Sequence, residues 1–188
     1  MVCMTTFVSL DFETTGAHKD NQNLPWQLAL AKWDANSGEI LLTKSWYLHI
    51  PLTHQFNPYA PGRWGELRET LATSPSLKEL WGEISHLLLD SLLVAHNAST
   101  ERTILKQQFP LHQFPTWIDT LKLFRIAYPT LPSYTLSDLL GAFQLTPRLQ
   151  ERFPELAPHD ALYDAVGCGM LLQFLRAFPD WNNLSRLV

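Results

Sequence analysis

Short apolar stretches separated by polar turns make up the first part of the chain. Residues 5–10 are β-prone and mostly apolar, which predicts a buried strand, and residues 26–33 repeat this character. A third apolar stretch, residues 39–48, follows a turn at residues 34–38. Because turn-forming residues separate the three stretches, they are predicted to pair as an antiparallel meander.

Helices and short strands are predicted to alternate over the rest of the chain. Apolar residues at helical spacing predict helices at residues 64–72, 76–89, 99–108, 120–128, 135–143 and 159–178, and short apolar runs predict strands at residues 91–95 and 116–119. The proline-containing segment 51–62 is predicted to be a loop. This order of elements indicates a mixed α/β sheet covered by helices, in which ligands bind at strand ends.

Length and charge narrow the class of protein. The 188 residues are enough for one domain, residues 1–188, that buries its core without disulfides. The chain has 14 basic and 18 acidic side chains, and its net charge of -4 argues against a general phosphate-binding surface. A local basic rim around an acidic site is compatible with this charge.

Cysteine usage and hydropathy predict a cytoplasmic protein. Cys3 and Cys168 have no metal-ligand spacing and are predicted to be ordinary thiols of a reducing compartment. The first residues lack a basic region followed by an apolar run, so no signal peptide is predicted. The longest apolar stretch, residues 87–95, is interrupted by Asp90 and Ser91, and no membrane span is expected.

The end of the first predicted strand carries candidate chemistry. Asp11 and Glu13 come just before the turn Thr14-Thr15-Gly16, and alternation along a strand directs both carboxylates to one face. Their repulsion is relieved if a divalent cation such as Mg²⁺ or Mn²⁺ lies between them. Taken alone, so short a pattern is more often two solvated acids at a strand end.

Two further stretches place polar side chains at the starts of helices. The fourth predicted strand leads into His96-Asn97 and then into a helix with Glu101 in its first turn. A simpler interpretation of these residues is a capped turn and an acid that favours a helix N-terminus. His159 and Asp164 are offset by about 140° on an ideal helix, so they face one centre only if His159 lies in a loop or at a helix start.

In order and spacing, these three motifs resemble those of the DEDDh branch of the DEDD family of 3′-to-5′ exonucleases. The resemblance spans Phe7 to about Phe174 and includes the connecting stretches Ile118–Leu121 and Tyr134–Leu140. It implies a ribonuclease H-like fold, with a mixed five-stranded sheet made of an antiparallel meander plus two parallel strands and flanked by helices.

By this resemblance, two Mg²⁺ or Mn²⁺ ions are held by four acids: Asp11, Glu13, Glu101 and Asp164. Two cations roughly 3.5–4 Å apart activate a water and stabilise the leaving 3′ oxygen of a phosphodiester. His159 is implied to be the general base, since an imidazole with an ordinary pKa of about 6.5 accepts a proton near neutral pH. Family members usually have aspartate where Glu101 stands, so a changed metal preference is expected.

The resemblance also implies contacts with nucleic acid. The residues expected to bind substrate are Thr14, Thr15, Gly16, Trp64, His96 and Asn97. For Trp64 two roles are open, stacking on a base or packing under the loop at residues 51–62. Candidates for a basic rim that contacts phosphates are Arg102, Lys106, Lys122 and Arg125.

These features predict a metal-dependent 3′-to-5′ exonuclease that releases nucleoside 5′-monophosphates from single-stranded 3′ ends. DNA is the expected substrate, and among relatives the chain looks most similar to exonuclease X-type enzymes or to polymerase proofreading subunits, which makes a polymerase or repair complex a candidate partner. Two alternatives stay open. One is an enzyme that trims RNA, since nothing identifies a reader of the 2′-hydroxyl. The other is a catalytically silent nucleic-acid-binding or scaffold domain.

Overall fold

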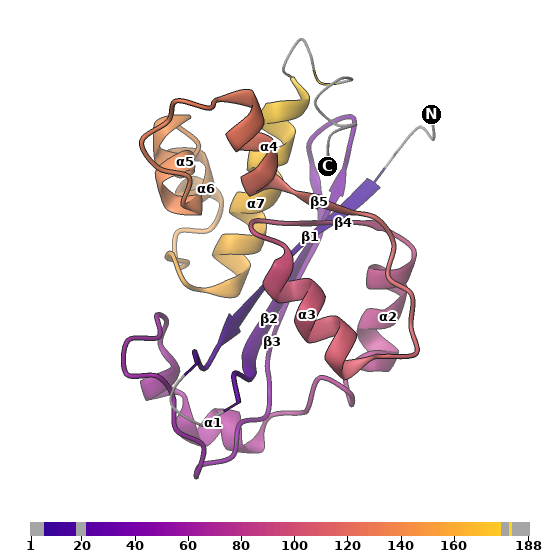
Figure 1. Cartoon of the computed structure of the whole chain (residues 1–188), viewed down its shortest axis with the longest axis vertical. Helices are drawn as coiled ribbons and strands as arrows, with labels where there is room; N and C mark the ends of the chain where they lie inside the picture. Colours follow the sequence, from indigo (N-terminus) through magenta and orange to yellow (C-terminus); the bar gives the residue numbers. More distant parts are fainter. Residues whose placement is uncertain (1–5, 18–21, 178–180, 182–188) are drawn as a thin grey trace.

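A mixed five-stranded sheet forms the centre of the fold in the computed structural model, which describes residues 6–17, 22–177 and 181 (Figure 1). The strands are β1 (Thr6–Thr14), β2 (Pro25–Asp34), β3 (Ile40–Tyr47), β4 (Leu92–Ala95) and β5 (Trp117–Asp119), in the spatial order β3-β2-β1-β4-β5. β1, β2 and β3 pair antiparallel, whereas β4 pairs parallel with both β1 and β5. The predicted meander with two parallel strands is confirmed.

β1 is the central strand, and its two edges are paired over different lengths. Its pairing with β2 runs from Thr6 to Thr14, but its pairing with β4 covers only Phe7 to Ser9. Beyond Ser9, that edge of β1 no longer pairs with β4. The half of β1 that carries the acidic residues is therefore open on this side to groups from other elements.

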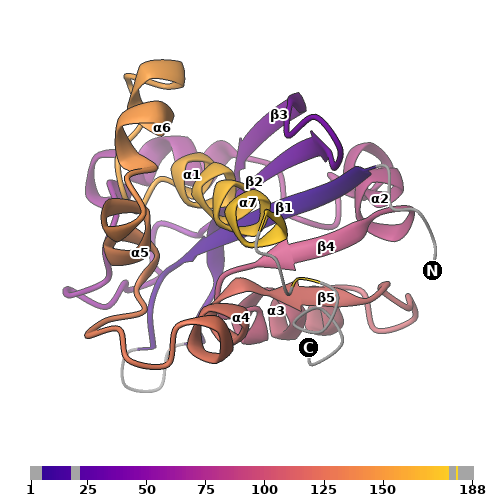
Figure 2. The ribbon, with the colours of Figure 1, turned by 90° about the horizontal axis from the view of Figure 1, so that it is seen from above.

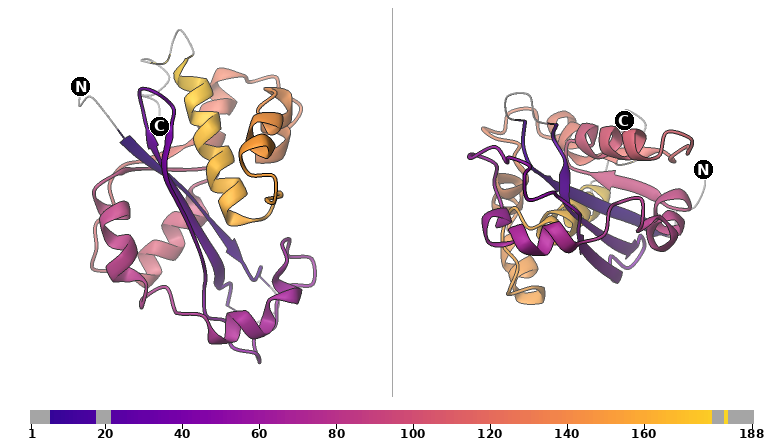
Figure 3. Two further views of the ribbon diagram at one scale, coloured as in Figure 1. Left: turned by 180° about the vertical axis from the view of Figure 1, so that it is seen from behind. Right: turned by 90° about the horizontal axis from the view of Figure 1, so that it is seen from below.

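Helices cover both faces of the sheet (Figures 2 and 3). They are the 3₁₀ turn η1 (Trp64–Glu66) and α1 (Arg68–Thr73), α2 (Trp81–Leu89), α3 (Ser99–Gln108), α4 (Thr120–Ala127), α5 (Leu136–Ala142), α6 (Thr146–Arg152) and α7 (Ala161–Arg176). One apolar cluster joins the sheet to α4, α5, α6 and α7, and a second joins it to α2 and α3. Two helical layers thus enclose the sheet.

Alternation along β1 decides which residues face which layer. Phe7 belongs to the apolar cluster on the α7 side, whereas Leu10 and Phe12 belong to the cluster with α2 and α3. Because successive side chains point to opposite faces, Asp11 and Glu13 share the α7 side with Phe7. The two acids are thereby directed toward the longest helix.

A small residue allows α7 to lie close to the sheet. An added Cβ at Gly169 would lie 2.3 Å from Cε2 of Trp33 on β2, so only glycine fits at this contact. The indole N–H of Trp33 in turn donates to the hydroxyl of Ser9 on β1 at 2.8 Å. This contact sets the distance between α7 and the strand that carries the acids.

Several element boundaries differ from the sequence-based prediction. The helix predicted at residues 64–72 is divided into η1 and α1, and residues 77–80 form turns before α2 begins. α6 was not predicted, although its proline in the first turn and buried Leu149 are helix-compatible signals. The predicted boundaries at residues 5 and 178 lie outside the described residues.

Within the described ranges, no helix has the length and apolar character needed to cross a membrane. Cys168 is a buried free thiol on α7, and burial raises its pKa above the ordinary range of a thiol. The thiol is therefore protonated at neutral pH and poorly reactive. Cys3 lies outside the described residues.

Candidate active site

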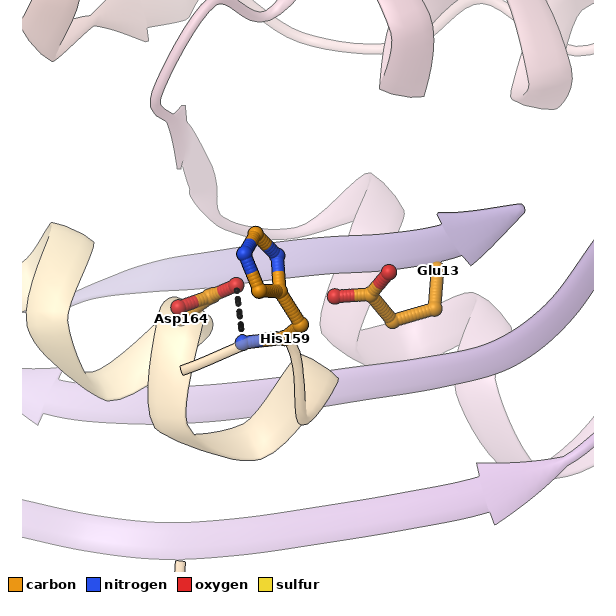
Figure 4. Close-up of side chains that lie close together, drawn as sticks. All are labelled: Glu13, His159 and Asp164. Carbon is orange, nitrogen blue, oxygen red and sulfur yellow. Dashed lines mark hydrogen bonds between the residues drawn. The ribbon is translucent and has the colours of Figure 1, made fainter. Parts of the chain in front are cut away.

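Glu13, His159 and Asp164 meet at the end of β1 (Figure 4). A ligand atom from each of the three lies within 4.8 Å of those of the other two. Glu13 is on β1, Asp164 is in the first turn of α7, and His159 is in the loop that precedes this helix. The structure thus brings together two of the predicted acids and the predicted base, from positions far apart in the sequence.

The backbone before α7 explains how His159 and Asp164 face one centre. His159 has a left-handed φ of 68°, and its N–H donates to Oδ2 of Asp164 at 3.2 Å. The carboxylate of Asp160 then caps the helix by accepting from the N–H of Leu162 at 2.9 Å. His159 therefore lies in a loop, which is the arrangement that the five-residue spacing required.

A buried glutamine ties this helix start to the sheet. Gln27 lies opposite Glu13 in the pairing of β1 and β2, and its Oε1 accepts from the N–H of Ala161 at 3.2 Å. Its amide nitrogen donates to the hydroxyl of Ser45 on β3 at 3.2 Å. Sequence analysis missed Gln27, although a polar side chain inside an apolar strand is a detectable signal.

Glu101 approaches the cluster from the opposite helical layer. It lies in the first turn of α3 and is only 3% exposed. The backbone of Phe12 forms a hydrogen bond with the carboxylate of Glu101. Among the neighbouring charges, that of Glu101 raises the pKa of Asp11 the most. This is possible because β1 no longer pairs with β4 beyond Ser9, so a side chain from α3 can reach β1 there.

Burial and the charges of nearby acids raise the pKa values of all four acids. Burial is the largest cause in each case. It acts with the charge of Asp164 to raise the pKa of Glu13 to about 8, and it raises the pKa of Asp164 itself to about 7. The pKa of Glu101 is raised to about 8, and that of Asp11 is raised well above its ordinary value. Without a cation, the cluster therefore retains protons near neutral pH.

The donor set fits a hard divalent cation. Four carboxylates supply the oxygen ligands that Mg²⁺ and Mn²⁺ prefer. Oε2 of Glu101 is buried and has no hydrogen-bond partner among the described residues, which is costly unless a ligand satisfies it. The residues that would hold metal are Asp11, Glu13, Glu101 and Asp164.

The raised pKa values predict that the metal-free protein becomes less stable as pH rises. Glu13 and Glu101 ionise near 4.5 when unfolded but near 8 when folded, so the folded state holds more protons between these values. For these groups, stability is greatest below about pH 4.5 and falls by several kcal/mol toward pH 8, because each unit of raised pKa corresponds to about 1.4 kcal/mol. Thermal unfolding with EDTA should show the melting temperature decreasing by roughly 10 °C or more over this range.

The control for this prediction is the same measurement with Mg²⁺ or Mn²⁺ present. A cation replaces the protons, so the decrease should become smaller or disappear. A melting temperature that rises with pH in EDTA would contradict the raised pKa values.

Thr15 occupies a supporting position and does not face a ligand. It is fully buried, its N–H donates to the carbonyl of Leu24 at 2.8 Å, and its hydroxyl accepts from the N–H of Leu24 at 3.0 Å. The turn Thr14-Thr15-Gly16 was expected to contact a nucleotide. In this structure the side chain of Thr15 is not accessible for such a contact, because it is buried and its polar groups are hydrogen-bonded within the protein. Thr14 and Gly16 are partly exposed.

His96 and Asn97 differ in what they offer to a ligand. Nε2 of His96 donates to the carbonyl of Tyr134 at 2.8 Å, and Nδ1 contacts the hydroxyl of Thr120 at 2.9 Å. Burial lowers the pKa of His96, so the ring is neutral and joins three segments. Asn97 is exposed, with a left-handed φ of 65°, and its Oδ1 accepts from the hydroxyl of Ser99 at 3.2 Å.

Asp119 is a residue of this region to which sequence analysis gave no role. Its Oδ1 accepts from the N–H groups of Asn97 at 3.1 Å and of Leu121 at 3.0 Å, which caps α4 and fixes the turn before α3. Its charge also raises the pKa of Glu101. The signal was present in the stretch Ile118–Leu121, which matched the family pattern.

For Trp64, the structure favours packing under the loop at residues 51–62 over stacking on a nucleobase. Its ring stacks on Phe56 with centroids 4.4 Å apart, and its indole N–H donates to the carbonyl of Ala60 at 3.0 Å. Trp64 thus supports the loop at residues 51–62. The four residues predicted as a basic rim are exposed on α3 and α4: Arg102, Lys106, Lys122 and Arg125.

Known proteins share both sequence and fold with this chain. The family model described as exonuclease (RNase_T) matches residues 8–169. The chain is 31% identical over 173 residues to a DNA polymerase III of PolC type from Halalkalibacterium halodurans, covering 88% of the chain and 11% of the polymerase. It is 29% identical over 185 residues to the 3′-5′ exonuclease DinG of Staphylococcus epidermidis, covering 96% of the chain and 19% of DinG.

A solved structure matches over nearly its whole length. Exonuclease X in complex with 5′ overhanging duplex DNA aligns with a TM-score of 0.60 and 26% identity, covering 96% of this chain and 93% of that one. By contrast, the chain spans only 11% and 19% of the two sequence relatives. The match to the family model, residues 8–169 of this chain, includes the four acids and His159.

Proposed function

Because the chain belongs to the exonuclease (RNase_T) family, as its DEDDh-type motifs predicted, we propose that it is a divalent-metal-dependent 3′-to-5′ exonuclease. It would act as one exonuclease domain on single-stranded 3′ ends and release nucleoside 5′-monophosphates. The observation that carries this proposal is the meeting of Glu13, His159 and Asp164 at the end of β1, with Glu101 approaching from α3.

The metal-binding acids come from backbone that is held in place. Asp11 and Glu13 are on β1, while Glu101 and Asp164 lie in the first turns of α3 and α7. When bound, two divalent cations supply positive charge beside the attacked phosphate, the attacking water and the leaving 3′ oxygen. The hydrogen bonds that fix the turn before α3 and the start of α7 keep Glu101 and Asp164 aligned around that position.

His159 is proposed to accept the proton of the attacking water. A ring nitrogen lies within 4.8 Å of carboxylate oxygens of Glu13 and Asp164, and the residue is exposed at the edge of the cluster. The water oxygen forms a bond to phosphorus, the bond from phosphorus to the 3′ oxygen breaks, and the water's proton goes to the imidazole. The hydrogen bond from its backbone N–H to Asp164 holds the residue beside the acid cluster.

His159→Ala is expected to lower turnover by on the order of 10²-fold or more, because a positioned general base contributes about that much. Binding of metal and of an oligonucleotide should persist, since the acids remain. The measurement is the pH dependence of the rate for parent and variant, with His49→Ala as a control because His49 is exposed outside the cluster. An unchanged rate and pH profile in His159→Ala would assign the base to another group.

Substrate preference is proposed from the relatives. DNA is the proposed substrate, because exonuclease X is described in complex with DNA and one relative is a DNA polymerase. The latter also makes a polymerase or repair complex the proposed partner. The test compares initial rates on 3′-labelled single-stranded DNA and RNA oligonucleotides of the same sequence, with Mg²⁺, with Mn²⁺ and with EDTA. Faster release of 5′-monophosphates from RNA would support an RNA-trimming enzyme instead.

A silent binding domain is the alternative that the cluster argues against. Glu13, Asp164 and the candidate base His159 lie together, and a buried carboxylate oxygen of Glu101 without a partner among the described residues is costly in a domain that binds no metal. The same assay separates the two functions. Oligonucleotide binding without any metal-dependent release of mononucleotides would show that the domain is a scaffold.

A further inference from the structure

The loop at residues 51–62 lies beside the start of α7 (Figures 1 and 3) and carries the exposed ring of Tyr59. Tyr59 is 93% exposed, the second-highest value among the large apolar and aromatic side chains described as exposed. A single exposed aromatic residue is common on protein surfaces. What distinguishes this one is the way in which its loop is attached to the acid cluster.

One attachment joins the loop to the turn that follows Glu13. The N–H of Asn57 donates to the carbonyl of Thr15 at 2.8 Å, and its side-chain amide donates to the carbonyl of Ala17 at 2.9 Å. Gly16 has a left-handed φ of 72°, and an added Cβ there would lie 2.8 Å from Cβ of Asn57. The loop and the turn therefore form one packed unit.

A second attachment joins the end of the loop to the candidate base. Gly62 has a left-handed φ of 93°, and an added Cβ would lie 3.2 Å from the carbonyl oxygen of His159 and 2.8 Å from the ring of Trp26. The loop thus touches the backbone of His159 directly. Tyr59 lies between this attachment and that of Asn57 in the sequence, so the segment that carries its ring is held at both ends against the turn after Glu13 and the backbone of His159.

Internal contacts hold the loop in one conformation. The side-chain oxygen of Asn57 accepts from the N–H of Tyr59 at 2.9 Å, and the guanidinium of Arg68 donates to the carbonyl of His54 at 2.9 Å. Trp64 supports the loop from below through Phe56, as described above. An aromatic ring on a fixed support loses little entropy when it stacks on a ligand.

We propose that Tyr59 is a stacking platform for a nucleobase of the single strand whose 3′ end enters the acid cluster. The proposal rests on the proposed function. Base-aromatic stacking uses the π-face that every base has, so the platform would hold a single strand without selecting its sequence. Bases in a duplex are stacked on their neighbours, so the platform also favours a single-stranded end.

Arg63 supplies a cation directly after the loop that carries Tyr59. It follows Gly62, and its guanidinium is close enough to Asp160 for the two charges to interact. It is paired with Glu66 at 3.0 Å, but both side chains are largely exposed, so this pair contributes little and can be exchanged for a phosphate. Tyr59 and Arg63 together offer one surface for a base and one for the backbone of a strand.

The test measures equilibrium binding of single-stranded oligonucleotides whose phosphorothioate 3′ linkages resist cleavage. Tyr59→Ala should raise the Kd roughly 5- to 100-fold, the range expected for loss of one stacked base. Tyr59→Phe should bind like the parent, because it keeps the ring. DNA and RNA oligonucleotides should lose affinity equally, since a stacking contact does not involve the sugar hydroxyl. Arg63→Gln should reduce the slope of log Kd against log salt by about 0.7.

Two variants serve as matched controls. Leu111→Ala removes a side chain that is 94% exposed on the connection between α3 and β5, and Lys44→Gln removes an exposed cation paired with Glu83. Both should bind like the parent. An unchanged Kd in Tyr59→Ala, or a Tyr59→Phe variant as weak as Tyr59→Ala, would overturn the stacking platform.

The outcome is independent of whether the protein is an enzyme. If the parent binds a single strand but releases no mononucleotides, the proposed exonuclease activity fails while the effect of Tyr59→Ala on the Kd still decides the platform. If the parent degrades oligonucleotides and Tyr59→Ala binds them normally, the exonuclease proposal stands and the platform is wrong. A parent that binds no single strand overturns the platform together with the exonuclease.

Discussion

Glu13→Ala is expected to reduce exonuclease turnover to the background of the assay while the protein stays folded. Glu13 is 7% exposed and offers a ligand atom to the cluster with His159 and Asp164, so its loss would remove one proposed ligand of the metal. The same variant should be more stable than the parent in EDTA at pH 8. The reason is that the pKa of Glu13 is raised to about 8 by burial and by neighbouring acids, and removing it relieves that repulsion.

Two measurements on the same preparations test this prediction. Initial rates on a single-stranded oligonucleotide with Mg²⁺ report turnover, and thermal unfolding in EDTA reports stability. Asp11→Ala should behave in the same way, whereas Glu151→Ala, which removes an exposed acid on α6, should match the parent in both. Parent-like turnover in Glu13→Ala would remove this residue from the metal site, and a loss of stability in EDTA would show that the acid has a structural role.

Glu101→Ala is expected to lower turnover by at least about 10³-fold, the upper range for losing one group that stabilises developing charge. Glu101 is the acid that departs from the usual aspartate of the family, and its Oε2 is buried without a partner among the described residues. Glu101→Asp should stay active with a different ratio of Mg²⁺ to Mn²⁺ rates. The shorter side chain moves the carboxylate by on the order of 1.5 Å, and Mg²⁺ demands near-octahedral geometry.

The measurement is the initial rate across a titration of each metal for the parent, Glu101→Ala, Glu101→Asp and Glu101→Gln. The glutamine variant is the matched control, because it keeps the size of the side chain and removes only its charge. Strong support of the parent by Mn²⁺ is expected. Titration curves for Glu101→Ala that coincide with those of the parent would mean that this acid serves only the start of α3.

The strands and the longest helix could be predicted because local pattern determines them. Apolar alternation on β1 placed Asp11 and Glu13 on one face, and the structure shows this face turned toward α7. Boundaries were less accurate where tertiary contacts decide them. Residues 77–80, for example, form turns before α2 although their apolar spacing suits a helix.

The contacts made by the residues that support the site could not be predicted, because the partners lie far away in the sequence. Gln27 accepts from the N–H of Ala161, and Asp119 accepts from the N–H of Asn97. No local pattern indicates that a strand residue will meet a helix start more than a hundred positions later. For the same reason Thr15 was expected to face a nucleotide, whereas its pairing with Leu24 buries it.

The sequence by itself determined the family, the fold class and the identity of the candidate acids and base, since these follow from motif order and from the period of apolar residues. Only the tertiary structure decided how Glu101 reaches the others. β1 stops pairing with β4 after Ser9, and a side chain from the opposite layer enters through that edge. The tertiary structure also decided the raised pKa values of the acids, such as Asp11 and Glu13. Burial and repulsion arise only when chain segments distant in sequence pack around the same point.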